Sequence, residues 1–350
     1  MRQRTQMVQA RSPLRIDFVG MTDYVPACQR FGGAIVNATI NKYIYATAVR
    51  RPDARIAIHA PDQEDLRVEV ASHEALDPRG KLGLAQEIIR RFDLGGSGVD
   101  LTTYSEMPAG AGLGSSSTIA TCIIAVMDAL AGRKLSAYEM AELARDCETV
   151  ALNTTYGWQD QYSPVTGGGF KYMKYWPICD GDDAAPICRG IEVDAIRMAP
   201  ADIAEIEKSL VVCFSGISRP AKSILDAVAE GVRDDKPEVV GALQAMNDCA
   251  AEMRLALLER RLADIGPLID EVWALHKRLH PDVTNDRVDE LCAIAKAAGA
   301  TGGRVCGAGG GGTMMFWCAP NHEHAVRKAL READARIFDF SVDMNGIILW

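Results

Sequence analysis

The sequence predicts an α+β fold in two domains that divide near residue 205. The chain has 350 residues, which is long enough for two domains or for one large one. Strand-like and helical segments alternate in the first half, whereas four helical segments and then a β-rich segment make up the second half. A strand, a glycine loop and a helix also follow one another over residues 99–130. We therefore expect domains at residues 1–205 and 206–350.

The strands expected in the first domain are rich in β-branched and aromatic residues. They are Leu14–Val19, Ala34–Val49, Arg55–His59, Leu66–Val70 and Val99–Glu106. The helices expected there carry apolar residues at helical spacing. They are Leu82–Phe92, Thr118–Leu130 and Ser136–Ala151. Ser136 and Glu139 form a capping-box pattern at the start of the last of these.

The second domain is expected to begin with strand Leu210–Phe214 and to continue through helices of clear apolar period. These helices are Arg219–Arg233, Glu238–Arg260, Ala263–Leu279, Asp286–Ala298 and, further on, Glu323–Ala333. Strands are expected at Thr313–Cys318, Ile337–Val342 and Ile347–Trp350.

Composition narrows the functional class. The formal net charge of −9 argues against nucleic acid or an acidic membrane surface as the main partner. The ten cysteines include no CxxC pair, which favours reduced thiols in a cytoplasmic protein. No signal peptide and no membrane-spanning run is expected. The six histidines form no metal-ligand pattern. The expected partner is a small molecule.

The segment Pro108–Ser117 is the most informative motif. It places Gly110, Gly112 and Gly114 directly before three serines, between a strand and a helix. Glycines allow the backbone to approach an anion, and the N–H groups at a helix start then point at it. The serines can cap the helix or offer oxygens to a phosphate or Mg²⁺. The Walker A lysine and the third glycine of the dinucleotide fingerprint are both absent, so the motif indicates a different phosphate loop.

A second cluster, Gly307–Gly312, is glycine at every position except Ala308. Glycine costs backbone entropy, so a run of this kind needs a reason such as positive φ or close approach of another group. A tight bend between strands is one interpretation. We favour a loop that abuts the first glycine loop or a substrate.

Three carboxylates are candidates for chemistry. Asp23, beside glycine turns, is equally consistent with binding a polyol and with forming an Asx turn. Glu148 lies on a helix and is more simply interpreted as part of a solvated face. Asp160 lies among glycines and aromatic residues on an expected loop, where it is either a general base or a turn residue.

These residues carry a resemblance to a known family. Three stretches occur in the order typical of the GHMP kinase superfamily: Arg11–Gly20, Pro108–Ser117 and Gly307–Gly312. Within it the chain resembles sugar kinases related to D-glycero-D-manno-heptose 7-phosphate kinase and fucokinase, through stretches such as Gly33–Ile40 and Gln159–Tyr162. The chain departs from heptose kinases at Val19–Met21, where those enzymes have a run of glycines.

The resemblance implies a two-domain fold with the active site in the cleft between the domains. It implies ATP and Mg²⁺ as cofactors, Asp160 as the base and Arg15 beside it, keeping Asp160 ionised and neutralising the transferring phosphoryl group. Ser116 and Glu148 would hold Mg²⁺. The ATP-binding residues it implies are Pro108, Gly110, Gly112, Leu113, Gly114, Ser115, Ser116 and Ser117. The substrate-binding residues it implies are Thr22, Asp23, Tyr24, Gly309 and Gly310.

The leading hypothesis is phosphorylation of a sugar or sugar phosphate at its anomeric hydroxyl, which would feed nucleotide-sugar biosynthesis. A substrate phosphate would require a basic pocket, for which the candidates are Lys42, Lys171, Lys174, Arg219 and Lys222. The alternatives are a kinase of an unphosphorylated hexose, a kinase of a non-sugar alcohol, and a catalytically silent sensor. A homodimer stays open.

Overall fold

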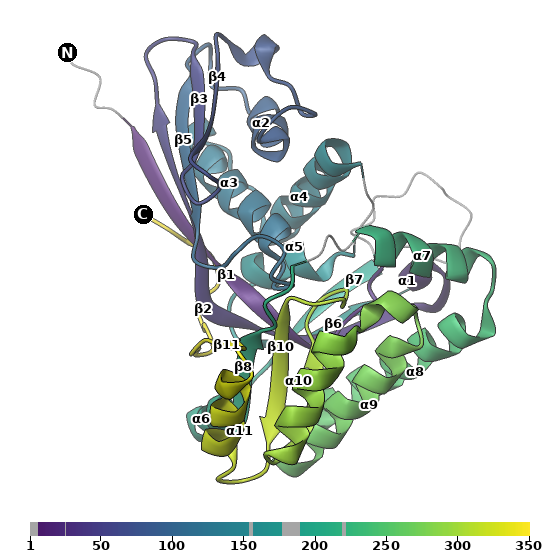
Figure 1. Ribbon diagram of the computed structural model, residues 1–350. Coiled ribbons are helices and arrows are strands. Elements are labelled where there is room, and N and C mark those ends of the chain that lie inside the picture. Colours follow the sequence, from purple (N-terminus) through teal and green to yellow (C-terminus); the bar gives the residue numbers. More distant parts are fainter. Residues whose placement is uncertain (1–5, 25, 154–156, 177–189, 219–221) are drawn as a thin grey trace.

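The computed structural model describes residues 6–350 except 25, 154–156, 177–189 and 219–221. Cys179, Cys188 and Arg219 lie outside the described residues. Two β-sheets, one of eight strands and one of four, organise the molecule, and helices pack against both (Figure 1). Within the described residues, no helix is long and apolar enough to cross a membrane.

The eight-stranded sheet contains the N-terminal strands. Its strands are β1 (Met7–Val19), β2 (Gly33–Arg50), β3 (Ile56–Ala60), β4 (Leu66–Val70), β5 (Val99–Ser105), β6 (Phe170–Tyr175), β7 (Ile191–Ile196) and β12 (Ile348–Leu349). The order is β12-β1-β2-β5-β3-β4, and β6 joins β2 with β7 beyond it. All pairs are antiparallel except β3 with β5. The long strand β2 therefore pairs with β1, β5 and β6 and forms the centre of the sheet.

The helices of the first half are α1 (Ala27–Phe31), α2 (Gly83–Arg90), α3 (Ser115–Ala131), α4 (Ala137–Leu152) and α5 (Gln159–Val165), with a short 3-10 turn at His73–Ala75. Most of helix α3 is buried because it packs on β1, β2 and α4. Ser136 and Glu139 form the predicted capping box of α4.

The four-stranded sheet has the order β11-β8-β10-β9. Its strands are β8 (Leu210–Phe214), β9 (Ala300–Val305), β10 (Thr313–Cys318) and β11 (Arg336–Ile337). The helices of the second half are α6 (Pro200–Ser209), α7 (Lys222–Arg233), α8 (Pro237–Leu258), α9 (Ile265–Lys277), α10 (Asp286–Ala297) and α11 (Glu323–Glu332), with 3-10 turns at Leu262–Asp264 and Pro281–Val283. Helices α8 and α9 pack against each other, and α9 and α10 both pack on β9 (Figure 1).

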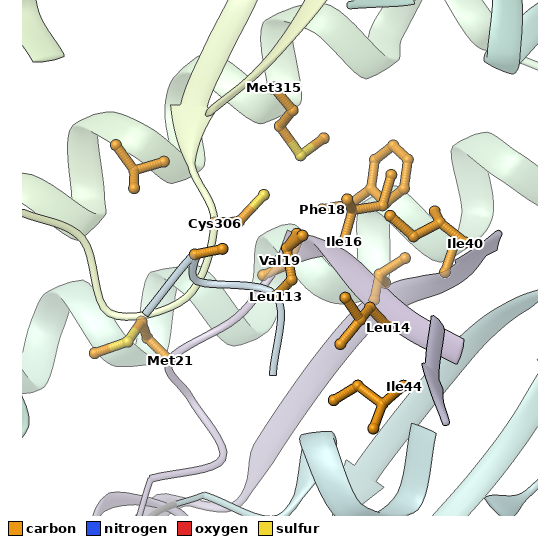
Figure 2. Packing of buried hydrophobic residues seen from close by; sticks show 14 of the residues in the cluster. Leu14, Ile16, Phe18, Val19, Met21, Ile40, Ile44, Leu113, Cys306 and Met315 are labelled. Atoms are coloured by element: carbon orange, nitrogen blue, oxygen red, sulfur yellow. The ribbon is translucent and has the colours of Figure 1, made fainter. Parts of the chain in front are cut away.

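One hydrophobic core extends across both halves. Buried side chains of β1, the apolar Leu113 of the first glycine loop, and Met315 of β10 belong to the same cluster (Figure 2). Helix α8 also packs on β2 of the other sheet. Apolar burial is the main source of stability in such interfaces, so the two halves are expected to hold each other in place.

Most predicted elements are present, and the differences are instructive. Residues 159–165, expected to be loop, form α5, so Asp160 lies on a helix. Strands β6, β7 and β9 and helices α1 and α6 were not predicted. The expected strand Ile337–Val342 is reduced to the end of β11 and one bridge between Ile40 and Val342.

The chain returns to its first sheet at the end. Ala10 and Arg11 of β1 pair with β12, and the amide of Asp343 donates to the carbonyl of Thr39 at 2.9 Å. The expected boundary at residue 205 falls within α6, between the two sheets. We propose a division near that residue, with the segment from Val342 onward packing on the first sheet.

Candidate active site

The first glycine loop turns sharply into α3. Gly110, Gly112 and Gly114 have φ values of 74°, 77° and 75°, in the left-handed region where a side chain is disfavoured. Gly114 is the N-cap of α3 and has no side-chain cap bond, so the expectation that a serine caps this helix is wrong. The three serines form the first turn instead, which leaves their hydroxyls for other partners.

Two of those hydroxyls bind Glu148. Ser116 Oγ donates to Glu148 Oε1 at 2.6 Å, and Ser117 Oγ donates to Oε2 at 2.9 Å. Gln161 Nε2 donates to the same Oε2 at 2.6 Å. Glu148 is 2% exposed, so the interpretation of this residue as part of a solvated face is wrong. Burial raises the pKa of Glu148, while the hydrogen bonds from Ser116, Gln161 and Ser117 oppose that rise.

Arg15 and Asp160 form a two-pronged ion pair. Arg15 Nε donates to Asp160 Oδ1 at 2.7 Å, and one terminal nitrogen donates to Oδ2 at 3.0 Å. The other terminal nitrogen donates to the carbonyl of Gly112 at 2.6 Å. Burial raises the pKa of Asp160, and the neighbouring Arg15 opposes the rise. The guanidinium therefore ties the carboxylate to the glycine loop and favours its ionised form.

The two glycine loops pack backbone against backbone. A Cβ on Gly112 would lie 2.7 Å from the carbonyl oxygen of Cys306, and one on Gly312 would lie 2.9 Å from that of Ala111. The amide of Thr313 donates to the carbonyl of Ala111 at 2.8 Å. The prediction that the second cluster abuts the first loop is confirmed, because side chains at these positions would force the loops apart.

A second buried ion pair fixes this contact. Arg304, which is fully buried on β9, donates to Asp17 Oδ2 at 3.3 Å and to the carbonyls of Asp17 and Phe18. Asp17 Oδ1 accepts from the amide of Gly307 at 3.0 Å. The start of the second glycine loop is thereby bound to β1 of the other sheet.

Two cavities meet at the first glycine loop. A cavity of about 340 Å³ is lined by the Arg15–Asp160 pair, Asp23, Glu148, the loop serines and residues from both halves of the chain, including Leu225 and Gly309. A second cavity of about 620 Å³ is lined on the other side by Pro108, Met107, Ile119, Leu82 and Thr103, among others. Gly110, Ser115, Ser116 and Leu152 line both. Since the resemblance implies ATP on the first glycine loop and a substrate beside Asp160, we call these the acceptor cavity and the nucleotide cavity, respectively.

The expected substrate residues do not all reach the acceptor cavity. Asp23, Tyr24 and Gly309 line it. Thr22 is absent from the lining, and its hydroxyl exchanges hydrogen bonds with the backbone of Ala34. The backbone of Gly310 bonds to Val283 and Asn285. Burial raises the pKa of Asp23 to about 6, against the hydrogen bonds that the Gln159 and Trp158 amides donate to it.

The candidates for a basic pocket are dispersed. Lys171 is buried at β6, where Nζ donates to the carbonyl of Gly169, and Lys174 stacks on the ring of Trp176. Lys222 Nζ donates to the carbonyl of Asn153, next to the cavity residue Leu152. Lys42 does not line either cavity. None of the described candidates lines either cavity, so the basic pocket is not found among them, and Lys222 is the one that bonds to a neighbour of a lining residue.

Comparison with known proteins decides the family. The chain matches the GHMP kinases N terminal domain over residues 82–168 and the GHMP kinases C terminal region over residues 253–336. It is 30% identical over 348 residues to the D-glycero-alpha-D-manno-heptose 7-phosphate kinase of Campylobacter jejuni, covering 98% of each chain. The chain belongs to the GHMP kinases.

Two further relatives point in the same direction. A crystal structure of a D-glycero-D-manno-heptose 1-phosphate kinase from Bacteroides thetaiotaomicron superposes with a TM-score of 0.76 at 27% identity over 98% of each chain. The bifunctional fucokinase/GDP-fucose pyrophosphorylase of Arabidopsis thaliana is 25% identical over 94% of this chain, which spans 32% of that protein. These relatives of this GHMP kinase are named as sugar kinases, and GHMP kinases use ATP.

The donor set of this GHMP kinase fits a phosphate with Mg²⁺. Ser115 Oγ and Gln161 Oε1 are buried at the acceptor cavity and have no hydrogen-bond partner among the described residues. Mg²⁺ prefers oxygen ligands and is commonly held by one or two carboxylates together with substrate phosphates. Glu148, Ser116 and the unpaired oxygens supply such a set.

Three residues of the GHMP kinase site were missed by sequence reasoning. Gln161 was overlooked as a site residue although it lies next to Asp160, and its side chain orients Glu148. Asp17 and Arg304 were also missed. Asp17 lies in the first signature stretch beside Arg15, which was the available signal. Nothing around Arg304 except its place before the second glycine cluster indicated a buried charge.

Proposed function

We propose that this GHMP kinase transfers the γ-phosphoryl group of ATP to the anomeric hydroxyl of a sugar phosphate of the heptose 7-phosphate class. The observation that carries the proposal is Asp160. Its carboxylate lines the acceptor cavity and accepts hydrogen bonds from Arg15 through both oxygens. A Cβ placed on Gly114 of the phosphate loop would lie about 3 Å from this carboxylate. A base and a phosphate loop at van der Waals distance are what phosphoryl transfer to an alcohol needs.

The two cavities suggest how ATP lies. The nucleotide cavity is lined mainly by apolar side chains such as Leu82 and Ile119, which suit a base and ribose. The residues shared by both cavities include Gly110 of the glycine loop and the first two serines of α3. The phosphate chain would follow the loop, and its terminal group would face the acceptor cavity. Pro108, on the nucleotide side, and Ser117, on the acceptor side, mark the two ends of this path.

Asp160 would accept the proton of the attacking hydroxyl. Each carboxylate oxygen accepts one hydrogen bond from Arg15 and retains a lone pair for another donor. The hydroxyl oxygen forms a bond to the γ-phosphorus as the bond to the β-phosphate oxygen breaks, and ADP leaves. Arg15 would lie beside the phosphoryl group and reduce its negative charge. Mg²⁺, held by Glu148 and Ser116, would supply further positive charge to the phosphate oxygens.

The acceptor class rests on the relatives and on the place of Lys222. The C. jejuni and B. thetaiotaomicron relatives are both named as heptose phosphate kinases. Lys222 lines neither cavity, but it begins α7 three residues before the lining residue Leu225, and its Nζ donates to Asn153, the residue after Leu152. A cation there could bind the phosphate at the far end of the sugar while Asp23 and Tyr24 contact its hydroxyls.

The test is an ADP-release assay with ATP and Mg²⁺ on a matched panel of sugars. The panel should pair each heptose 7-phosphate with its dephosphorylated form and include fucose and galactose, and ³¹P NMR should locate the new phosphate by its coupling to H1. We expect turnover on a heptose 7-phosphate and a product with an anomeric phosphate. Faster turnover of the free sugars would contradict the phosphorylated acceptor, and a product phosphate elsewhere would contradict the anomeric site. The Asp160→Asn variant is the control for contaminating kinases.

A further inference from the structure

Asp23 makes an unexpected contact with the segment that carries Asp160. Asp23 Oδ2 accepts hydrogen bonds from the amides of Trp158 and Gln159, at 2.9 and 3.0 Å. These are the two residues directly before Asp160. The sequence offered two roles for Asp23, polyol binding and a local turn, and this contact spans 135 residues and belongs to neither.

We propose that Asp23 is a positioning residue that fixes the backbone of residues 157–160 and so places Asp160 against the phosphate loop. The proposal rests on the proposed function, in which Asp160 is the base. Asp23 would act on the reaction through the geometry of Asp160, whatever hydroxyls its second oxygen also contacts.

Gly157 gives independent support. A Cβ at Gly157 would lie 2.0 Å from Asp23 Oδ2 and 2.5 Å from its Cγ, far inside van der Waals contact. Only glycine therefore lets the carboxylate reach both amides. The backbone at residue 157 is shaped to receive Asp23, which a carboxylate used only for sugar hydroxyls would not require.

Both ends of this contact are held rigidly. Thr22 exchanges hydrogen bonds with Ala34, and a Cβ on Gly33 would lie 2.6 Å from the Thr22 carbonyl oxygen, so the chain before Asp23 is fixed on β2. On the other side, Trp158 is fully buried and stacks on Tyr175 of β6. Because the segments on both sides of the Asp23 hydrogen bonds are fixed, these bonds hold the Trp158–Gln159 backbone in one position.

The position of residues 157–159 matters because Asp160 is closely packed against Gly114 and Arg15. A Cβ on Gly114 would lie about 3 Å from the Asp160 carboxylate, and Arg15 donates hydrogen bonds to both carboxylate oxygens. A displacement of about 1 Å at a reacting group can cost about 100-fold in rate. Loss of the hydrogen bonds that fix residues 157–159 should therefore lower kcat more than it changes KM.

The experiment compares three variants and a matched control. Asp23→Ala removes both hydrogen bonds, Asp23→Asn retains one acceptor oxygen, and Gly157→Ala displaces the carboxylate while leaving Asp23 in place. Ser136→Ala removes the side chain that accepts from the Glu139 amide at the exposed start of α4. It controls for the loss of a hydrogen bond between a side chain and a backbone amide at a helix start. Two quantities are measured for each: kcat and KM for the acceptor, and residue-resolved hydrogen exchange of the Trp158 and Gln159 amides. Binding of a fluorescent ATP analogue reports whether each variant is folded.

We expect kcat to fall about 100-fold in Asp23→Ala and Gly157→Ala, less than fivefold in Asp23→Asn, and not in Ser136→Ala. Both amides should exchange faster in the first two variants only. An increase in acceptor KM with kcat and amide exchange unchanged would overturn the proposal and leave Asp23 a sugar contact. If the wild-type chain phosphorylated no acceptor, the proposed function would fail. Amide exchange would still show whether Asp23 fixes the segment, and unchanged exchange in Asp23→Ala would refute the positioning role by itself.

Discussion

The site contains two arginine–aspartate pairs that start from the same strand and differ in what surrounds them. Arg15 and Asp17 both lie on β1, two residues apart. Arg15 pairs with Asp160 of α5, and Asp17 pairs with Arg304 of β9. The Asp160 side chain is 26% exposed, whereas both members of the Asp17–Arg304 pair are fully buried. One pair faces the acceptor cavity, and the other is enclosed.

The difference shows how one kind of ion pair can serve either chemistry or assembly. Removing two charges from water costs several kcal/mol, so an enclosed pair needs further hydrogen bonds to compensate. Arg304 obtains them from the carbonyls of Asp17, Phe18 and Val305. Asp160 instead leaves lone pairs open toward the cavity. An ion pair whose hydrogen-bonding groups all have protein partners is a structural pair. An ion pair that keeps acceptor lone pairs free can act on a ligand.

The largest expected effect is on the open pair. Asp160→Asn retains the size of the side chain but cannot accept a proton, so kcat should fall about 1,000-fold, within the range for losing a general base. The melting temperature should fall by only a few degrees, because Asp160 is partly exposed and the amide oxygen of the variant still accepts a hydrogen bond from the buried Arg15. Steady-state kinetics and calorimetry on the same preparation measure both. A kcat within tenfold of wild type would show that another group acts as the base.

The enclosed pair should give the opposite result. Arg304→Met leaves Asp17 buried without its counter-charge, which is expected to lower the free energy of unfolding by about 3 kcal/mol. Urea unfolding measures this, with Arg327→Met, which loses an exposed ion pair to Asp339, as the matched control worth well under 1 kcal/mol. Equal urea unfolding midpoints for the two variants would show that the enclosed pair contributes no more to stability than an exposed pair.

The smallest expected effect is a shift in pH dependence. Arg15→Gln removes the group that opposes the rise in the pKa of Asp160, so that pKa should rise further. Because activity requires the carboxylate and is lost as the pH falls through its pKa, the acid limb of kcat/KM should move to higher pH. Initial rates between pH 5 and 8 would test this, against Arg30→Gln as a control of equal charge change at an exposed ion pair with Asp235 that lines neither cavity. An acid limb that stays in place would mean that Arg15 does not set the ionisation of Asp160.

Local patterns were enough to predict the first glycine loop and the helix after it. Glycine spacing and apolar periodicity are properties of neighbouring residues, and they fixed Gly110–Gly114 and α3 closely. Helix α5 escaped prediction because it has only seven residues, with Pro164 inside it, and so shows little periodicity. Strands β6 and β7 were missed after a glycine-rich segment that resembles loop.

Burial was the property that the sequence could not supply. Glu148 has the position of an exposed helical residue, and it is buried because Ser116 and Ser117, more than 30 residues away, contact it. The Asp17–Arg304 pair joins residues 287 positions apart. Such contacts depend on how sheets and helices pack, which periodicity does not determine. The resemblance to GHMP kinases brought Arg15, Glu148 and Asp160 together before the structure did, without indicating which charges are enclosed.

The return of β12 to the edge of β1 has a consequence for synthesis of the chain. Residues 342–350 are made only after the whole second sheet. Once the other strands of the first sheet are complete at Ile196, β1 must therefore wait for β12 while about 150 residues are added at about 5–20 residues per second. During those seconds the first sheet exposes an unpaired edge, the kind of surface on which strands of other molecules pair. A nascent chain stalled before Val342 would therefore be a strong substrate for chaperones, although almost all of its active-site residues would already be present.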